Sequence, residues 1–446
     1  MKASFCPHCV APDAKGAKER QYQRLFKDLS AATFDPAHDL ALAEAGGPMQ
    51  ADANTMNNPR IAAGWPFYAQ IVAHDVTRDR APLSNEEEVR GLKNFHKPRL
   101  DLECLYGGGP VAQPYFYDAE DIDKFLMGRN DKDEPKDIAR NRQGIALIAD
   151  ARNDTYLFIS QLHLALQKLH NVLVDNVREA GTKDADVFSE AQRLTRWHHQ
   201  WVVLNEFLPL HVGEDVLSKL LAHNAAAVDE AFVPVEFAAG AFRFGHAQVR
   251  DRYDVNAQLR DVPIFPDLVG QQPVTAARAL EMPYIFELGG DIEPLASKRI
   301  DASYSEAMMN LPKALTGELD DPKQSALAYR DLQRGASLGL PSGEAVAERL
   351  GIEPLDRKAL ALPEGLCEED TPLSYYVQKE AFVQTQGLHL GEVGGRLVGG
   401  VLVDLLYSDP TSYLVQEPSW QPTLSREGEG FGIADLLRAA GAAEPS

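Results

Sequence analysis

The chain has 446 residues, and its 66 acidic against 44 basic side chains give a formal net charge of −22 at pH 7. A surface this negative repels polyanions, which argues against nucleic acid and anionic membranes as partners. The length is enough for one large or two medium domains with a deep core around a cofactor.

The opening segment lacks the apolar stretch of a secretory signal, and no later window approaches eighteen uninterrupted apolar residues. Four cysteines, at positions 6, 9, 104 and 367, are too few for a disulfide framework in a chain of this size. Both features favour a soluble, cytoplasmic protein without a membrane span. The motif from Cys6 to Cys9 has no second pair nearby, so we interpret it as two solvated thiols rather than a zinc or redox site.

Helical periodicity dominates the chain. Residues 1–60 are polar and are expected to form an extension packed on the surface, with a short helix at 17–30, whereas residues 61–446 form the main domain. Apolar residues spaced by three and four from about 158 to 177 predict a buried helix. A second helix is predicted from 187 to 207, with Pro209 marking its end. Further helices are expected at 214–222, 300–312, 323–336, 343–350, 373–384, 391–407 and 432–440.

Extended β-type alternation is scarce, so the sequence predicts a mainly α fold in a single large helical domain.

Two segments carry residues suited to metal chemistry. In GWPFYAQIVAHDVT, Gln70 and His74 stand at i and i+4, so both side chains can reach one small ligand above a metal plane. A neutral imidazole can take a proton from one peroxide oxygen and return it to the other. In AFRFGH, His246 could hold an iron from below. The pair indicates the two faces of a haem pocket.

A third segment, DARNDT, supplies Arg152 just before the first long helix. A guanidinium is permanently charged and rich in donors, so it can stabilise the charge that builds on a departing oxygen. Each motif alone has a plainer interpretation, because a His beside an Asp on a helix is more often a structural pair than a catalyst.

Taken together and in order, these motifs resemble the animal-type haem peroxidases of the peroxidase-cyclooxygenase superfamily, over about residues 60 to 440. The resemblance implies a haem buried between a distal and a proximal helix. It implies these roles: His74 as distal base, Gln70 as its hydrogen-bonding partner, Arg152 as distal arginine, His246 as proximal iron ligand, and His163 and His170 as structural residues.

The sequence departs from the mammalian members at two haem-attachment positions, where Ala73 and Thr155 stand in place of carboxylates. The resemblance is thus to a bacterial-like member with non-covalent haem b, and it gives weaker grounds for halide oxidation. Asp331 aligns with the asparagine that usually contacts the proximal histidine, and a carboxylate there would lower the reduction potential. Arg243 and Arg334 are candidates for binding the haem propionates, although Arg334 could equally form an ordinary helix ion pair.

The family also holds a calcium ion beside the distal histidine. The corresponding groups here are the side chains of Asp75, Asp101 and Glu103, with backbone carbonyls of Lys97 and Arg99. Lys97 replaces a hydroxyl ligand, so its ammonium group could swing away or stand in for the metal.

The function implied by the resemblance is a haem peroxidase, oxidised by hydrogen peroxide to a ferryl intermediate and reduced by phenols or small anions. A fatty-acid oxygenase of the same superfamily would need a tyrosine three residues before the proximal histidine, where Arg243 stands. A haem-binding or sensing protein without turnover is the third alternative, and the presence of both His74 and Arg152 argues against it. The oligomeric state stays open.

Overall fold

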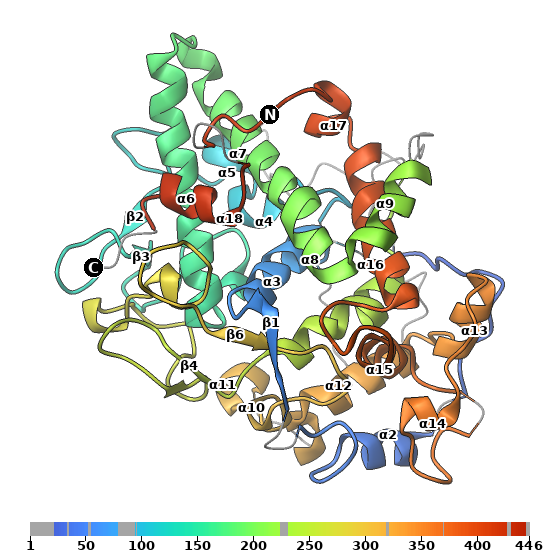
Figure 1. Ribbon diagram of the computed structural model, residues 1–446. Coiled ribbons are helices and arrows are strands. Elements are labelled where there is room, and N and C mark those ends of the chain that lie inside the picture. The colour runs from blue at the N-terminus through green and yellow to red at the C-terminus, as the bar shows by residue number, and fades with distance from the viewer. Residues whose placement is uncertain are drawn as a thin grey trace, which may run out of the picture.

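The structure is a computed structural model that describes residues 22–33, 35–51, 55–78, 94, 96–223, 231–317, 321–368, 370–425 and 430–442. Helices dominate these residues, as Figure 1 shows. The α-helices are α2 (Pro36–Ala43), α3 (Trp65–Val76), α4 (Glu103–Tyr106), α5 (Gly109–Ala112), α6 (Leu157–Glu179), α7 (Val187–Val202), α8 (Leu208–Val212), α9 (Glu214–His223), α10 (Glu306–Met309), α11 (Lys313–Thr316), α12 (Leu327–Ser337), α13 (Gly343–Arg349), α14 (Arg357–Leu360), α15 (Leu373–Thr385), α16 (Glu392–Ser408), α17 (Tyr413–Gln416) and α18 (Ile433–Ala439).

Short 3₁₀ and π segments join or extend these helices. The two π segments are η5 (Val203–Phe207) and η6 (Glu236–Gly240). The 3₁₀ segments are η2 (Pro114–Phe116), η3 (Ala151–Asp154), η4 (Asp184–Asp186), η7 (Ala241–Gln248), η8 (Ala276–Arg278), η9 (Met282–Tyr284) and η10 (Pro322–Ser325).

The strands of the described residues form three small antiparallel pairs. β1 (Asn57–Ala62) pairs with β6 (Ala296–Lys298), β2 (Met127–Gly128) with β3 (Asp137–Ile138), and β4 (Arg252–Tyr253) with β5 (Val262–Pro263). Because β1 and β6 lie far apart in the sequence, their pairing ties the segment before α3 to the middle of the chain. A mainly α fold is confirmed.

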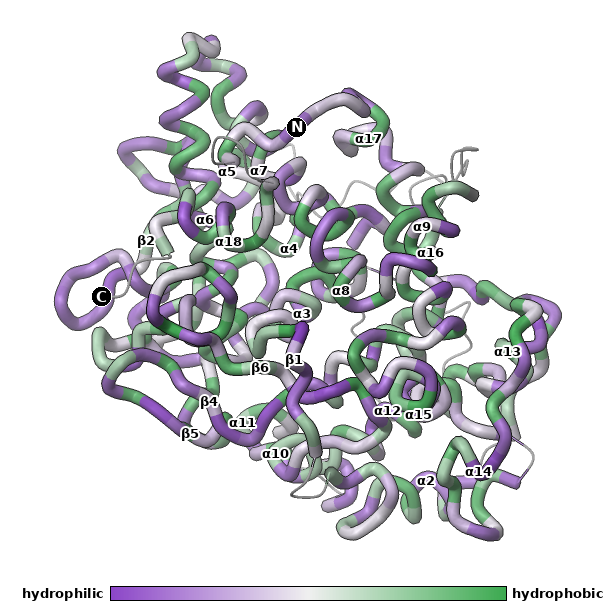
Figure 2. Tube along the Cα trace, in the orientation of Figure 1, coloured by the Kyte–Doolittle hydropathy of each residue, from purple (hydrophilic) through white to green (hydrophobic). Residues whose placement is uncertain are grey.

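The long helices α6 and α7 pack against each other (Figure 1). The apolar positions that predicted α6 are buried, among them Phe158, Leu162 and Leu169. Hydrophobic and hydrophilic residues alternate along its coils in Figure 2, as expected for a helix with one face in the core.

α3 lies in the core and carries the predicted distal residues near its C-terminal end. Its N-cap, Gly64, permits a close approach, because a Cβ there would lie 2.4 Å from the ring of Phe286. Phe67 stacks on Phe158 of α6 with ring centroids 4.5 Å apart. These contacts fix α3 against α6 and so fix the place of His74.

The predicted proximal segment is helical but not α-helical. The π segment η6 runs directly into the 3₁₀ helix η7, which contains His246. α12 packs on η6, and α15 packs on both η6 and η7. Phe237 and Phe244 are buried and anchor the segment.

Most predicted helices are confirmed, with three differences. Pro209 does not end the second helix, because the π turn of η5 precedes it and Pro209 falls in the first turn of α8, where its missing N–H costs little. In the range 300–312 only α10 is helical. Tyr304 instead forms an isolated bridge with Gln50. The described part of the range 17–30 is not helical.

The described part of the N-terminal extension is integrated into the core rather than only packed on the surface. Tyr22, Phe26, Leu42 and Met49 are all buried. These few apolar residues could not be recognised as core residues from the sequence, because residues 1–60 are mostly polar and the apolar positions are too widely spaced to form a helical or strand pattern. Cys6 and Cys9 lie outside the described residues.

Candidate functional site

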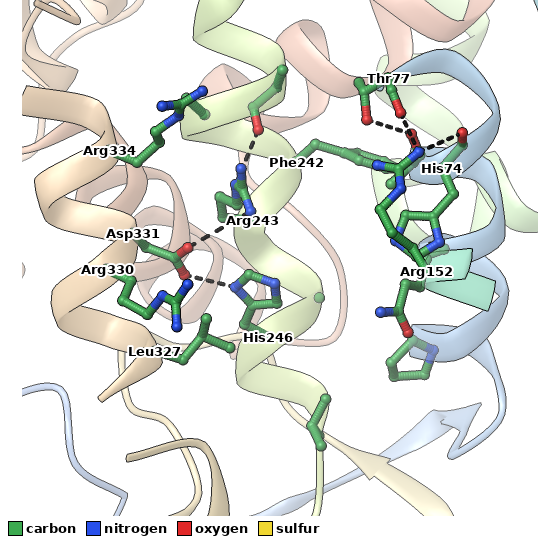
Figure 3. A pocket seen from close by; sticks show the side chains of 18 of the residues that line it. His74, Thr77, Arg152, Phe242, Arg243, His246, Leu327, Arg330, Asp331 and Arg334 are labelled. Atoms are coloured by element: carbon green, nitrogen blue, oxygen red, sulfur yellow. Dashed lines mark hydrogen bonds and ion pairs between the residues drawn. The ribbon is translucent and has the colours of Figure 1, made fainter. Parts of the chain in front are cut away.

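A cavity of about 550 Å³ lies between α3, η7 and α12 (Figure 3). Seven of the residues singled out from the sequence line it: Gln70, His74, Arg152, Arg243, His246, Asp331 and Arg334. They come from segments spread over more than 260 positions, and the fold brings them together. His163 and His170 do not line the cavity. Both are buried in α6, where Nδ1 of His170 lies 2.9 Å from the hydroxyl of Tyr106.

The tautomer of His74 is set by Asn153. Nδ1 of His74 lies 2.7 Å from Oδ1 of Asn153, an oxygen that can only accept, so Nδ1 carries the hydrogen. The amide nitrogen of Asn153 in turn donates to Nδ1 of His163 at 3.1 Å. His74 is therefore held with an unprotonated Nε2, the form that a general base requires.

The surroundings of His74 also keep it neutral. Burial and, to a smaller extent, the charge of the nearby Arg152 guanidinium lower the pKa of His74 to about 3, although Asp150 and Asn153 partly oppose this. At neutral pH the imidazole is an acceptor and not a cation.

Hydrogen bonds hold the Nε and Nη2 side of the Arg152 guanidinium, whereas its Nη1 faces the cavity. Its Nη2 donates to the carbonyl oxygens of His74 at 3.0 Å and Thr77 at 2.6 Å. Nη2 and Nε also contact the carboxylate of Asp150, with Nη2 2.7 Å from Oδ2. Among the described residues Nη1 makes no hydrogen bond, so this donor is available to the cavity that Arg152 lines. Figure 3 shows the guanidinium beside His74 and Thr77.

Asp150 holds Arg152 in place because it is buried and charged. Burial raises the pKa of Asp150, but the hydrogen bonds and charge of Arg152 outweigh that effect and leave the pKa below its ordinary value. Asp150 also caps η3 by accepting from the backbone N–H of Arg152 at 3.0 Å.

On the opposite wall, His246 is paired with Asp331. Nδ1 of His246 lies 2.6 Å from Oδ2 of Asp331, and the hydroxyl of Tyr304 donates to the same oxygen at 2.8 Å. Gln378 donates to that hydroxyl at 2.9 Å. Burial raises the pKa of Asp331, but His246, Arg243 and Tyr304 together lower it below the ordinary value. The carboxylate therefore stays charged beside the imidazole.

Three arginines line the cavity around this pair. Arg243 donates from Nε to the carbonyl of Ala238 at 3.0 Å, and its Nη1 lies 3.9 Å from Oδ1 of Asp331. Arg330 and Arg334 stand one turn apart on α12, on either side of Asp331. Burial lowers the pKa of Arg334, an effect partly offset by Tyr22.

The two positions without haem-attaching carboxylates also lie at the cavity. Ala73 has no polar side-chain atom, and the hydroxyl of Thr155 donates to the carbonyl of Arg152 at 2.9 Å. Neither side chain can form an ester to a porphyrin methyl group.

The carboxylates predicted as calcium ligands lie near one another, at Asp75 of α3 and at the start of α4. Asp75 is fully buried, its Oδ2 accepts from the backbone N–H of Leu102 at 2.9 Å, and its Oδ1 has no hydrogen-bond partner. Burial raises the pKa of Asp75, and so do the charges of Asp101 and Glu103. Burial and the charge of Glu103 raise the pKa of Asp101, and the charge of Lys97 partly opposes this.

Lys97 and Arg99, whose carbonyls were the other predicted ligands, lie in the same loop. The Lys97 carbonyl accepts from the Arg99 backbone N–H at 2.8 Å, and Nε of Arg99 lies 3.7 Å from Asp409. In the described part of the chain, no three His, Cys, Asp or Glu side chains are arranged to hold a metal ion. The unpaired Oδ1 of Asp75 is free to accept a cation, but a calcium ion there would need backbone carbonyls or water as ligands besides these side chains.

Sequence reasoning missed four residues of the site. Asn153 and Asp150 flank Arg152, and the Asp-x-Arg spacing of an N-cap was the available signal. Tyr304 and Tyr22 lie in ranges predicted as helices and belong to no site motif, so only the fold reveals their roles.

The sequence model of the family described as animal haem peroxidase matches residues 84–359, more than half of the chain. The chain belongs to the animal haem peroxidase family. The matched range contains Arg152, His246, Asp331 and Arg334. It does not contain Gln70 or His74, whose place beside Arg152 comes from the structure.

Characterised relatives are distant. The chain is 22% identical to the chorion peroxidase of Drosophila melanogaster over 219 residues, covering 46% of this chain and 26% of that protein. It is 24% identical over 300 residues to a peroxidase of the same organism, covering 56% of this chain and 42% of that one. The chain therefore spans less than half the length of these relatives.

Solved structures confirm the fold. Peroxidase A from Dictyostelium discoideum matches with a TM-score of 0.67 at 14% identity, over 94% of this chain and 92% of that one. The fatty acid alpha-dioxygenase of Oryza sativa matches with a TM-score of 0.64 at 13% identity, over 92% and 76%.

Membership of the family implies haem binding. The cavity suits that cofactor, because an imidazole with its Nδ1 already bonded, apolar walls and several guanidinium groups are the chemistry a haem with two propionates needs. No helix among the described residues is long and apolar enough to cross a membrane.

Proposed function

We propose that this protein is a peroxidase that uses non-covalent haem b to reduce hydrogen peroxide, with electrons from phenols or small anions. One observation carries the proposal. His74 with Arg152, and His246 with Asp331, line opposite walls of one cavity of about 550 Å³ (Figure 3). This is the arrangement expected when one imidazole holds an iron and another serves the bound peroxide.

In this proposal His246 would hold the haem iron. Its Nδ1 is occupied by Asp331, so Nε2 is the nitrogen left for the iron. Arg334 and Arg243 bind the propionates through their planar forks. When bound, the haem supplies the iron that accepts peroxide and the two electrons that cleave its O–O bond.

The distal residues move the proton and stabilise charge. Nε2 of His74 would take the proton from one oxygen of hydrogen peroxide and return it to the other oxygen, which leaves as water. Arg152 offers Nη1 to the charge that develops on the leaving oxygen. Gln70, one turn before His74 on α3, lines the same cavity and holds peroxide or water by hydrogen bonds.

The decisive experiment is reconstitution with haem followed by stopped-flow mixing with hydrogen peroxide and then a phenol. The proposal predicts a Soret band, a rapid spectral change with one equivalent of peroxide, and its reversal by two equivalents of the phenol. A Soret band that peroxide leaves unchanged would instead favour a haem-binding or sensing protein, and no band at all would overturn the proposal.

A fatty-acid oxygenase is the alternative from the same superfamily, but the likeness to the plant dioxygenase is one of fold alone. Arg243 stands three residues before His246, where that chemistry needs a tyrosine. Oxygen uptake driven by a long-chain fatty acid, measured with an oxygen electrode, would favour the alternative.

We also propose the carboxylate cluster of Asp75, Asp101 and Glu103 as a cation site, filled by calcium or by the ammonium group of Lys97. Calcium binding predicts a rise in melting temperature on adding calcium that Asp75→Asn removes. No rise in the parent protein, with a loss of stability in Lys97→Ala, would assign the charge to lysine instead.

A further inference from the structure

The N-terminal segment contributes a side chain to the cavity. Tyr22 is 6% exposed and lines the cavity together with Thr77, Arg243 and Arg334. It stands more than 40 positions before the first predicted site residue, in a segment with no motif. Contacts of the neighbouring residues hold Tyr22 at this place.

Backbone and side-chain contacts pin this segment. Arg24 donates from Nη1 to the carbonyl of Gly339 at 2.7 Å and from Nη2 to that of Leu338 at 2.6 Å, at the C-terminal end of α12. The fully buried carboxylate of Glu236, in η6, accepts the backbone N–H groups of Leu25 and Phe26.

A bridge between Gln23 and Pro234 adds a further bond, because the N–H of Val235 donates to the Gln23 carbonyl at 3.0 Å. Residues 22–26, which we call the N-terminal strap, thus join α12 to η6, the two elements that flank His246.

The surroundings of the Tyr22 hydroxyl suit the binding of a carboxylate. The charges of Arg152, Arg243 and Arg334 act on this hydroxyl, and all three arginines line the same cavity. Burial raises the pKa of Tyr22 to about 12 despite these guanidinium groups, so the phenol keeps its proton and remains a donor. A neutral O–H donor among guanidinium groups binds an anion and not a cation.

We propose that Tyr22 donates a hydrogen bond to a haem propionate alongside Arg334, and that the N-terminal strap thereby retains the cofactor. The proposal rests on the proposed haem site and adds to it a binding residue from outside the motif region. Tyr22 is a cofactor-binding residue here, whereas Arg24 is a positioning residue that acts through the strap.

The test measures haem loss, which needs no turnover. Transfer of haem to excess apomyoglobin is followed in the Soret region for the parent protein, Tyr22→Phe and Arg24→Gln. A hydrogen bond to a charged group contributes enough that Tyr22→Phe should lose haem about tenfold faster. Arg24→Gln, which leaves the cavity lining unchanged, should also speed the loss because it loosens the strap.

Tyr156→Phe is the matched control. Tyr156 also lines the cavity, but the charge acting on it is that of Arg330, and the shift in its pKa has no contribution from Arg243 or Arg334. Its haem loss should equal that of the parent protein. Melting temperatures of all variants separate an effect on haem from an effect on folding.

A second cofactor tests whether Tyr22 acts through the propionate. With haem dimethyl ester, which has no free carboxylate, the ratio of loss rates between Tyr22→Phe and the parent should fall to about one. An equal ratio with both cofactors would overturn the proposal, since Tyr22 would then act through packing alone. A parent protein that takes up no haem would refute the proposed function, which is a distinct outcome.

Discussion

Nδ1 of His246 and Oδ2 of Asp331 are 2.6 Å apart, in a pair that is buried on the carboxylate side and open to the cavity on the imidazole side. The hydroxyl of Tyr304 shares that oxygen, so two donors compete for one charge. The electron density on the imidazole therefore depends on both partners, and so does the potential of any iron that the imidazole holds.

Replacing Asp331 with Asn should raise the reduction potential of the haem, because an amide draws less on the Nδ1 proton than a carboxylate does. Activity should fall by about 10–100-fold, the range typical for partners of metal ligands. Tyr304→Phe should shift the potential in the opposite direction, since it removes the competing donor. Spectroelectrochemical titration of both variants measures the signs, and shifts of the same sign would contradict this account.

Replacing Arg152 with Ala should slow the reaction with hydrogen peroxide by about 10²–10³-fold, as expected for the loss of one donor to developing charge. The haem should stay bound, because Arg152 acts on the distal side. Stopped-flow kinetics under pseudo-first-order peroxide give the rate constant. Arg142→Ala, an exposed arginine outside the cavity lining, is the control. Equal rate constants for the two variants would remove Arg152 from the mechanism.

The pH dependence follows from the lowered pKa of His74. A protonated imidazole cannot accept the peroxide proton, so the rate constant falls as pH drops through the pKa of this group. With that pKa at about 3 rather than 6.5, the rate constant should be flat from pH 8 to pH 5. A sigmoidal loss centred near pH 6.5 would show that His74 titrates as an exposed histidine does.

Asn153 should matter through the tautomer of His74. Asn153→Ala removes the acceptor of the Nδ1 hydrogen and frees the ring to place a hydrogen on Nε2, where it blocks proton uptake. We expect the rate constant with peroxide to fall at least about tenfold, within the range that general-base catalysis contributes, with an unchanged Soret band. Asn153→Asp keeps the acceptor and should restore much of the rate. A rate constant for Asn153→Asp no higher than that for Asn153→Ala would contradict the role of Asn153 in setting the tautomer.

The long helices and the main cavity residues could be predicted because short stretches of sequence indicate both. α6 has a strong apolar period, and His74, Arg152 and His246 stand in short motifs with recognisable order. Asp331 was expected beside His246, and the two side chains lie 2.6 Å apart.

The sequence could not show the residues that tertiary contacts alone bring in. Tyr304 lies in a range predicted as helix but forms a bridge with Gln50, and Tyr22 depends on the anchors of Arg24 and Glu236. Pro209 was misjudged because the π turn η5 leads into a new helix, so that Pro209 falls in the first turn of α8, where its missing N–H costs little.

The most direct test of the central claim is a haem titration of the parent protein and His246→Ala, followed by resonance Raman spectroscopy of the ferrous form. The account predicts one haem per chain with an iron–histidine stretching band in the parent, and in His246→Ala the loss of that band with weakened binding that added imidazole restores. An iron–histidine band that persists in His246→Ala would contradict it.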